Sequence, residues 1–264
     1  MTNMKIGIIS DIHEDITRLK QAIEVLEKEK CKQIVCLGDS VGYSVPYYGF
    51  LWSRNSHEVI KLLKKKCNII LAGNHDLYSV RKLPKYTAGF NYPKNWYSLD
   101  YQERVKLSKD KVYLYEYNEL PALLTKEDKE FIKKLPEFVV KKYDGVNILF
   151  SHYAYPDLVG TTTFEPKTQK DVKRHFAFMK EKGCKIGISG HDHKEGIMLF
   201  TQKEAKHIPF GKVTLNDNPV WFHGPGVVNG SFENGVMTFD TEKLEITTIP
   251  LSSPKHTPPE WRKL

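Results

Sequence analysis

Residues 5–13 read KIGIISDIH, an apolar run that ends in an acidic residue and a histidine. A run that is almost entirely apolar and rich in isoleucine is typical of a strand buried on both faces. Similar runs recur at 33–37, 68–72, 146–150 and 185–189. Apolar residues at helical spacing over 15–30 and 56–66 separate the first three runs. This alternation of strands and helices predicts an α/β core with parallel strands.

The remaining sequence divides into recognisable segments. We expect helices over 125–135 and 168–182, the first with Thr125 and Asp128 in a capping arrangement. A strand over 138–143 should form a hairpin with 146–150 around Asp144-Gly145, and short strands should dominate after residue 196. Residues 77–124 are rich in aromatics and too long for a bare loop, so we predict an insertion with its own helices. We expect a single domain over 1–250 and a tail over 251–264.

Polar clusters follow each of the five core runs. In chain order they contain Asp11 and His13, Asp39, Asn74 with His75 and Asp76, His152, and His191 with Asp192 and His193. Ligands of open α/β sheets bind outside the carboxyl ends of the strands. The five clusters should therefore converge on one site.

The residue types in these clusters indicate a metal centre. Imidazole combined with carboxylate suits transition metals, whereas an all-oxygen set would suit Mg or Ca. The candidate ligands outnumber those that one ion needs: Asp11, His13, Asp39, Asn74, His152, His191 and His193. Seven ligands with one shared carboxylate predict two ions, with Mn or Fe favoured and Zn as the alternative. Two such ions are a known device for displacement at phosphorus.

The motifs D-x-H, G-D-x-x-G-Y, G-N-H-D, S-H and G-H-x-H occur here in that order. Together, over roughly residues 4–250, they resemble the calcineurin-like metallophosphoesterase superfamily. The resemblance implies a four-layer αββα sandwich with the metal site at the sheet ends. The segment 38–43 (GDSVGY) is similar to the G-D-x-V-G-Y form of small prokaryotic phosphoesterases. It lacks the arginine of the G-D-x-x-D-R-G motif, by which protein phosphatases and diadenosine tetraphosphatases grip phosphate.

The resemblance also implies a role for each motif residue. Asp11, His13 and His193 would hold one metal. Asn74, His152 and His191 would hold the other, and Asp39 would bridge the two. His75, paired with Asp76, resembles the general acid of the family or else its phosphate-binding histidine. The chain departs from the family pattern at Asp192, where a neutral residue is more usual, and at 229–231 (NGS), which lacks a proline.

These observations favour a dimetal phosphoesterase that hydrolyses a phosphomonoester or phosphodiester by attack of a metal-bridging hydroxide. Two alternatives stay open: a nuclease or cyclic-nucleotide phosphodiesterase of the same superfamily, and a non-catalytic metal-binding scaffold. The formal charge of 40 − 32 = +8 and the aromatic insertion keep nucleic acid open as a partner. A small-molecule phosphoester is nevertheless favoured, because the predicted site is itself acidic before metal binds.

The sequence also bears on the location of the protein. It contains no apolar run long enough to span a membrane and no segment that reads as a signal peptide. Four cysteines without a CxxC spacing predict free thiols and a cytoplasmic protein. No pattern in the sequence indicates an oligomeric state.

Overall fold

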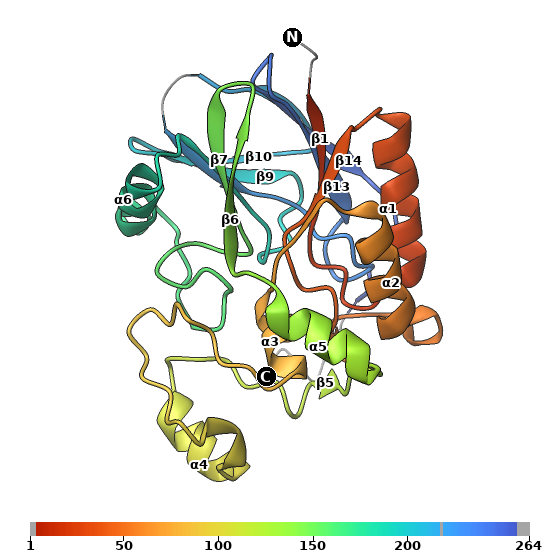
Figure 1. Cartoon of the computed structure of the whole chain (residues 1–264), viewed down its shortest axis with the longest axis vertical. Coiled ribbons are helices and arrows are strands. Elements are labelled where there is room, and N and C mark those ends of the chain that lie inside the picture. Colours follow the sequence, from red (N-terminus) through yellow and green to blue (C-terminus); the bar gives the residue numbers. More distant parts are fainter. Residues whose placement is uncertain (1–3, 217–218, 258–264) are drawn as a thin grey trace.

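The computed structural model describes residues 4–216 and 219–257 (Figure 1). Two six-stranded sheets form the centre of the fold. The first has the order β11 (Gly211–Thr214), β14 (Glu245–Pro250), β13 (Gly235–Asp240), β1 (Lys5–Ile9), β2 (Gln33–Cys36) and β4 (Ile69–Ile70). The second has the order β10 (Ala205–Ile208), β9 (Ile197–Thr201), β12 (Val220–His223), β8 (Ile186–Ser189), β7 (Val146–Ser151) and β6 (Phe138–Tyr143).

Parallel strands adjoin one another in both sheets, which confirms the predicted α/β class. Strand β1 pairs in parallel with β2, and β2 with β4. Strand β8 pairs in parallel with both β7 and β12. These strands therefore send their carboxyl ends toward the same edge of their sheets, where the polar clusters follow.

Apolar side chains join the sheets to each other and to the helices. Ile8 of the first sheet and Phe150 of the second belong to one fully buried cluster, which lies between the sheets. Leu26 of α1 (Ile16–Lys28) and Val59 of α2 (Ser56–Lys66) pack on the other face of the first sheet. Met179 of α6 (Lys173–Glu181) packs on the second sheet. Figure 1 shows α1 and α2 on one side of the two sheets and α6 on the other.

The ends of two predicted helices show how local side chains set a boundary. Helix α5 (Lys126–Lys134) has the expected capping box, in which Thr125 and Asp128 each accept from the other's backbone N–H. Helix α6 begins at Lys173 instead of residue 168. The carboxylate of Asp171 accepts from the backbone N–H and the hydroxyl of Thr168, and this turn occupies the residues expected to form the first helical turn.

The aromatic insertion, residues 77–124, carries short helices of its own, separated by irregular segments. Beyond the end of α3 (Asn74–Ser79), it contains the 3₁₀ turn Trp96–Ser98 and α4 (Tyr101–Ser108). It then forms β5 (Glu119–Leu120), which pairs with β3 (Tyr43–Ser44). Its other residues follow an irregular path that brings it back beside the sheet edge.

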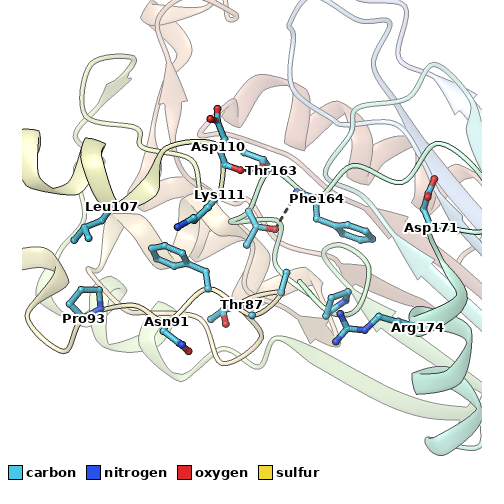
Figure 2. Close-up of a pocket in the computed structure, with 15 residues that line it drawn as sticks. Thr87, Asn91, Pro93, Leu107, Asp110, Lys111, Thr163, Phe164, Asp171 and Arg174 are labelled. Atoms are coloured by element: carbon cyan, nitrogen blue, oxygen red, sulfur yellow. Dashed lines mark hydrogen bonds between the residues drawn. The ribbon is translucent and has the colours of Figure 1, made fainter.

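A cleft of about 660 Å³ lies between the insertion and residues 156–174 (Figure 2). Phe90 and Lys111 of the insertion line one side, and Phe164 and Arg174 line the other. None of the predicted site residues lines this cleft.

No helix within 4–216 or 219–257 is both long and apolar enough to cross a membrane.

The predicted tail, residues 251–264, is described as far as residue 257. Within it, the backbone N–H of His256 donates to the Gly230 carbonyl (2.8 Å). The rest of that tail, 258–264, lies outside the described residues.

Two glycines bring the ends of β2 and β4 into close contact. Gly38 follows β2 with a φ of +117°, and a Cβ placed on it would lie 2.5 Å from the backbone nitrogen of Gly73, which follows β4. A Cβ on Gly73 would lie 2.1 Å from Asp39 Oδ1. This backbone contact sets Asp39 and Asn74 next to each other.

We predict that Gly38→Ala destabilises the protein by about 3 kcal/mol, because it combines a strained φ with a backbone clash. Gly145→Ala is the matched control, since Gly145 also has a positive φ (+88°) but no atom within 4 Å of its would-be Cβ. The control should lose about 1 kcal/mol. The measurement is the free energy of unfolding in urea with a chelator present. Equal losses for the two variants would show that the Gly38–Gly73 contact is not tight.

Candidate metal centre

All seven predicted ligand side chains meet at the carboxyl ends of the core strands. Asp11 and His13 follow β1, Asp39 follows β2, Asn74 follows β4, His152 follows β7, and His191 and His193 follow β8. The first sheet thus supplies four of these side chains and the second sheet three. They form two adjoining groups.

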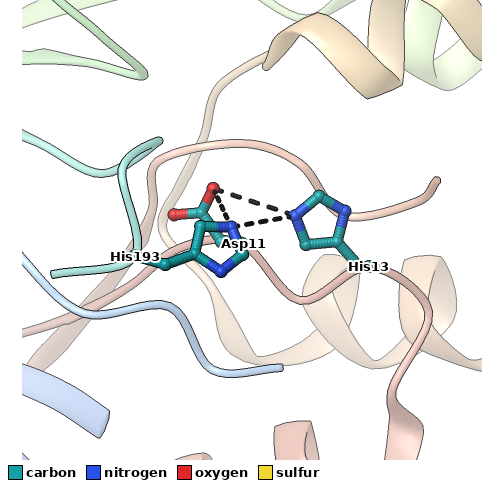
Figure 3. A group of neighbouring side chains, drawn as sticks. All are labelled: Asp11, His13 and His193. Atoms are coloured by element: carbon teal, nitrogen blue, oxygen red, sulfur yellow. Dashed lines mark hydrogen bonds and ion pairs between the residues drawn. The ribbon is translucent and has the colours of Figure 1, made fainter. Parts of the chain in front are cut away.

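Asp11, His13 and His193 form the first group (Figure 3). The Nε2 atom of His193 lies 3.3 Å from Asp11 Oδ1 and 3.3 Å from His13 Nε2. His13 Nε2 is 3.9 Å from the same Asp11 oxygen. Three potential ligand atoms therefore face one small space.

Asp39, Asn74, His152 and His191 form the second group. His152 Nε2 lies 3.1 Å from Asp39 Oδ2 and 3.3 Å from His191 Nδ1. The amide nitrogen of Asn74 donates to Tyr115 Oη (2.8 Å). The amide oxygen is left 3.2 Å from Asp39 Oδ2, His152 Nε2 and His191 Nδ1. Turned over, the amide would present its nitrogen to the same three atoms and to the Val159 carbonyl (2.9 Å), and its oxygen would accept from Tyr115 Oη (2.8 Å). The turned orientation satisfies the hydrogen bonds of the metal-free site, whereas a bound metal ion would require the oxygen to face the site.

Most of these spacings match those expected around metal ions. Ligand atoms that surround one ion at about 2.1 Å lie about 3.0–3.4 Å apart. Asp39 Oδ2 lies between the groups, 3.1 Å from His152 Nε2 and 3.9 Å from His13 Nε2. The oxygen is thus placed within reach of both groups. The two clusters of histidine and aspartate suggest a dimetal site.

Backbone carbonyls fix the orientation of two of the histidine rings. His13 Nδ1 donates to the Gly42 carbonyl (2.8 Å), and His152 Nδ1 donates to the Leu37 carbonyl (3.2 Å). Each bond turns the Nε2 lone pair of its ring toward the site, as partners of metal-bound histidines commonly do. Burial and the charge of His75 lower the pKa of His13 to about 3. This ring is therefore neutral, which is the form that binds metal.

The two carboxylates among the predicted ligands are held in their charged form. Burial alone would raise the pKa of Asp11, but His193 and the other histidines around it hold that pKa well below its ordinary value. The same balance, dominated by His152, lowers the pKa of Asp39. Asp11 Oδ1 is buried and makes no hydrogen bond within the described residues. A buried, charged oxygen without a hydrogen bond fits a metal ligand.

The backbone at the site is strained. Five of the seven predicted ligands have a left-handed φ: Asp11 (55°), His13 (47°), Asp39 (52°), His191 (74°) and His193 (48°). Such values are uncommon outside glycine and cluster at functional sites. The fold therefore holds these side chains in place against a local conformational cost.

His75 lies beside both groups, but its partner differs from the one predicted. One of its ring nitrogens lies within 4.8 Å of ligand atoms of His13 and Asp39. Its Nδ1 hydrogen bonds with Glu119 in place of the expected Asp76. Asp76 instead accepts from the backbone N–H groups of Ser40 (3.0 Å), Val41 (3.2 Å) and Gly73 (3.1 Å). Asp76 thus ties the two loops together and makes no hydrogen bond to the His75 ring in the described structure.

Three contributors to the site were missed in the sequence. Tyr115 and Glu119 reach it from the insertion, through Asn74 and His75. The ring of Tyr48 lies 4.9 Å from the His13 ring and is nearly parallel to the His193 ring at 6.5 Å. None of the three stands in a motif. The aromatic richness of residues 77–124 was the one available signal, and it did not single out a residue.

Asp192, the unusual carboxylate in the last motif, is engaged by side chains outside the two groups. Its Oδ2 accepts from Tyr153 Oη (3.4 Å) and lies 3.3 Å from Nδ1 of the buried His223. These contacts explain how an extra acidic residue is accommodated next to His191 and His193.

Known proteins resemble this chain in sequence or in structure. An uncharacterized protein of Methanocaldococcus jannaschii is 26% identical over 274 residues, covering 94% of this chain and 88% of the relative. The crystal structure of a metallophosphoesterase from Sphaerobacter thermophilus aligns with a TM-score of 0.66 at 16% identity, over 95% of this chain and 89% of that one. A hypothetical protein from Pyrococcus horikoshii aligns with a TM-score of 0.58 at 14% identity, over 94% and 87%.

The family model described as calcineurin-like phosphoesterase matches residues 4–195, a range that contains all seven predicted ligands. The solved structures show the same fold, and the site has the donor chemistry of a metal centre. The chain belongs to the calcineurin-like phosphoesterase family.

Proposed function

We propose that this protein uses two metal ions to hydrolyse a small or medium phosphomonoester or phosphodiester. The observation that carries the proposal is the convergence of seven donor side chains from both sheets, with the donor-atom distances given above for each group between 3.1 and 3.9 Å. Family membership supports phosphoester hydrolysis as the reaction.

In this proposal each candidate residue has a separate role. Asp11, His13 and His193 would hold one ion, Asn74, His152 and His191 the other, and Asp39 would be shared. Bound ions would supply positive charge for the phosphoryl oxygens and a nucleophilic hydroxide at neutral pH. His75 would donate a proton to the leaving group from Nε2, because Glu119 already engages its Nδ1.

The GDSVGY segment supports a small substrate of the type handled by the small prokaryotic phosphoesterases. Gly42 stands where the G-D-x-x-D-R-G motif has its second aspartate, and it is used structurally here. Its carbonyl accepts from His13, and its N–H donates to Glu14 (3.0 Å). Tyr43, which replaces the motif's arginine, is buried and donates to the Tyr48 carbonyl (2.7 Å). This segment therefore has no arginine that could bind the phosphate of a substrate.

The ligand types and the cysteines support two further proposals, one on the identity of the metal and one on the location of the protein. Mixed imidazole, carboxylate and amide ligands suit Mn or Fe, with Zn as the alternative. All four cysteines are free thiols, which favours a reducing compartment such as the cytoplasm.

A second candidate is a nuclease or cyclic-nucleotide phosphodiesterase. It is favoured by Tyr113 in the insertion, whose side chain is exposed (49%) and could stack on a base. A non-catalytic metal-binding scaffold is the third reading, and the contact between His75 and Glu119 weighs against it, because a scaffold needs no proton donor.

We expect purified protein to bind two equivalents of transition metal and to hydrolyse phosphoesters in Mn²⁺. Metal analysis should be followed by a panel with a phosphomonoester, a phosphodiester, a cyclic nucleotide and single-stranded nucleic acid. Turnover of the last two with salt-sensitive binding would favour the second candidate. Two bound ions without turnover of any panel member would refute the enzyme proposal and support the scaffold.

We predict that Asp39→Asn lowers kcat by about 100-fold or more, since changes to residues that merely support ligands already lower activity or affinity by 10–100-fold. The variant should also bind less than two equivalents of Mn²⁺. Asp110→Asn is the control, because Asp110 is exposed and has a similar left-handed φ (58° against 52°). Near-normal turnover of Asp39→Asn with two ions bound would remove Asp39 from the shared position.

We predict that His75→Ala retains both metal ions but loses about 100-fold or more in kcat with poor leaving groups. Substrates with good leaving groups need no proton in the transition state, so they should lose much less. His207→Ala, a change at an exposed histidine, should behave as wild type. A uniform loss across a series of leaving groups would contradict the general-acid role.

A further inference from the structure

The insertion returns to the metal centre at residues 115–119, and its two contacts there are made to consecutive residues of α3. Asn74 Nδ2 donates to Tyr115 Oη (2.8 Å), and His75 Nδ1 hydrogen bonds with Glu119. We propose that Tyr115 and Glu119 are positioning residues, which orient the Asn74 amide for metal binding and the His75 ring for proton transfer. The Glu119 part of this inference rests on the proposed phosphoesterase function.

Tyr115 Oη is a hydrogen-bond partner of the Asn74 amide in either of its two orientations, since a hydroxyl can accept from the amide nitrogen or donate to the amide oxygen. The two ends of an amide have similar shape but opposite hydrogen-bonding character, and only the oxygen binds a metal ion. Asn74 is 3% exposed, so an NH₂ group without a partner would be unfavourable there. With the oxygen toward Asp39 and the two histidines, the NH₂ group finds its partner in Tyr115 Oη.

In the metal-free site the opposite orientation of the amide is the better satisfied one, even with the Tyr115 hydroxyl present. The nitrogen then donates to Asp39 Oδ2 and to the ring nitrogens of His152 and His191, all at 3.2 Å, and to the Val159 carbonyl at 2.9 Å, while the oxygen accepts from Tyr115 Oη. A metal ion would have to reverse that orientation before it could bind the oxygen. After that reversal Tyr115 Oη is the partner of the NH₂ group, so without the hydroxyl the buried NH₂ group of the metal-bound form would be left unpaired. Removal of one hydroxyl, at a residue that touches no metal, should therefore weaken metal binding.

Glu119 acts on His75 in a comparable way. The carboxylate side chain is 3% exposed, and its bond to Nδ1 fixes both the plane and the tautomer of the ring. Nε2 is then the nitrogen available to a substrate. The Tyr115 ring packs beside the same imidazole, with centroids 4.6 Å apart, which further restricts rotation of the ring.

The segment that carries these two residues is held firmly against the core. Glu119 in β5 is in register with Ser44 in β3, and Val45 N–H donates to the Asn118 carbonyl (2.9 Å). The guanidinium of Arg54 bonds both to the Pro121 carbonyl and to the buried carboxylate of Glu14, the residue after His13. The insertion and the first ligand loop are thus joined through Arg54.

The Tyr115 part is tested by Mn²⁺ titration of metal-free protein, a measurement that needs no activity. We expect Tyr115→Phe to weaken binding of one of the two ions by about 10-fold or more. Tyr117→Phe is the control: it makes the same change on the same segment at a side chain that is 75% exposed. Unchanged affinity for both ions in Tyr115→Phe would overturn this part.

A second comparison separates positioning from a general loss of structure. If Tyr115 acts through the amide, then Asn74→Ala/Tyr115→Phe should bind Mn²⁺ no more weakly than Asn74→Ala alone. Additive losses in the double variant would show that Tyr115 acts by another route and would overturn the assignment.

The Glu119 part is tested by kinetics with good and poor leaving groups. Glu119→Ala should lower kcat about 10-fold or more for poor leaving groups, with KM and Mn²⁺ binding unchanged. Glu119→Gln retains an acceptor for Nδ1–H and should recover part of the rate. In a His75→Ala background, neither change at Glu119 should lower the rate further.

Additive rate losses of Glu119→Ala and His75→Ala, or a loss that is equal for all leaving groups, would overturn the Glu119 part. A wild-type protein with two bound ions and no turnover would instead refute the proposed function. The Mn²⁺ titrations of Tyr115→Phe would still decide the Tyr115 part in that case.

Discussion

Lone pairs from seven side chains point into one small volume, and this concentration of negative potential is the constraint on which the rest of the site depends. Two of the side chains, Asp11 and Asp39, are buried carboxylates held in their charged form. Burial and the charge of His75 keep His13 neutral, so this ring contributes a lone pair instead of positive charge. Cations are the natural complement of such a site, because they satisfy the charges and the lone pairs together.

The two-sheet core provides the rigidity that this arrangement needs. Strained loops persist only where the surrounding structure determines them, and here the loops leave strands whose side chains are fully buried between the sheets, such as Ile8 and Phe150. The ligands come from both sheets, so metal ions would join the two halves of the core. Asp76 adds a further link, because one carboxylate accepts from the loops that follow β2 and β4.

Sequence reasoning predicted the core and the convergence of the candidate ligands because both depend on short-range patterns. Apolar runs mark the central strands, and each predicted ligand lies within a few residues of a strand end, so convergence follows from parallel pairing.

The contact of Glu119 with His75 could not be predicted in this way. It is separated from His75 by 44 residues, and the path between them is an irregular insertion whose course no pattern sets. Asp76 was chosen as the partner of His75 because it is adjacent in sequence, yet its carboxylate points to backbone amides of neighbouring loops. The early start predicted for α6 failed for a similar reason, since the turn-forming bonds of Asp171 outweighed apolar spacing.

The core and the insertion make different contributions to the site. Every predicted ligand follows a core strand, and a metal clamp of this kind acts on the phosphoryl group, which all phosphoesters share. The side of the site that would meet the leaving group contains His75, and the contacts that orient His75 come from the insertion. Selection among phosphoesters depends on the leaving group, so it should be determined by the insertion and the segments that pack on it. The basic charge of the chain is a weaker guide, because two buried carboxylates lie among the predicted metal ligands and lysines such as Lys64, Lys65 and Lys66 stand in the last turn of α2, outside the ligand clusters.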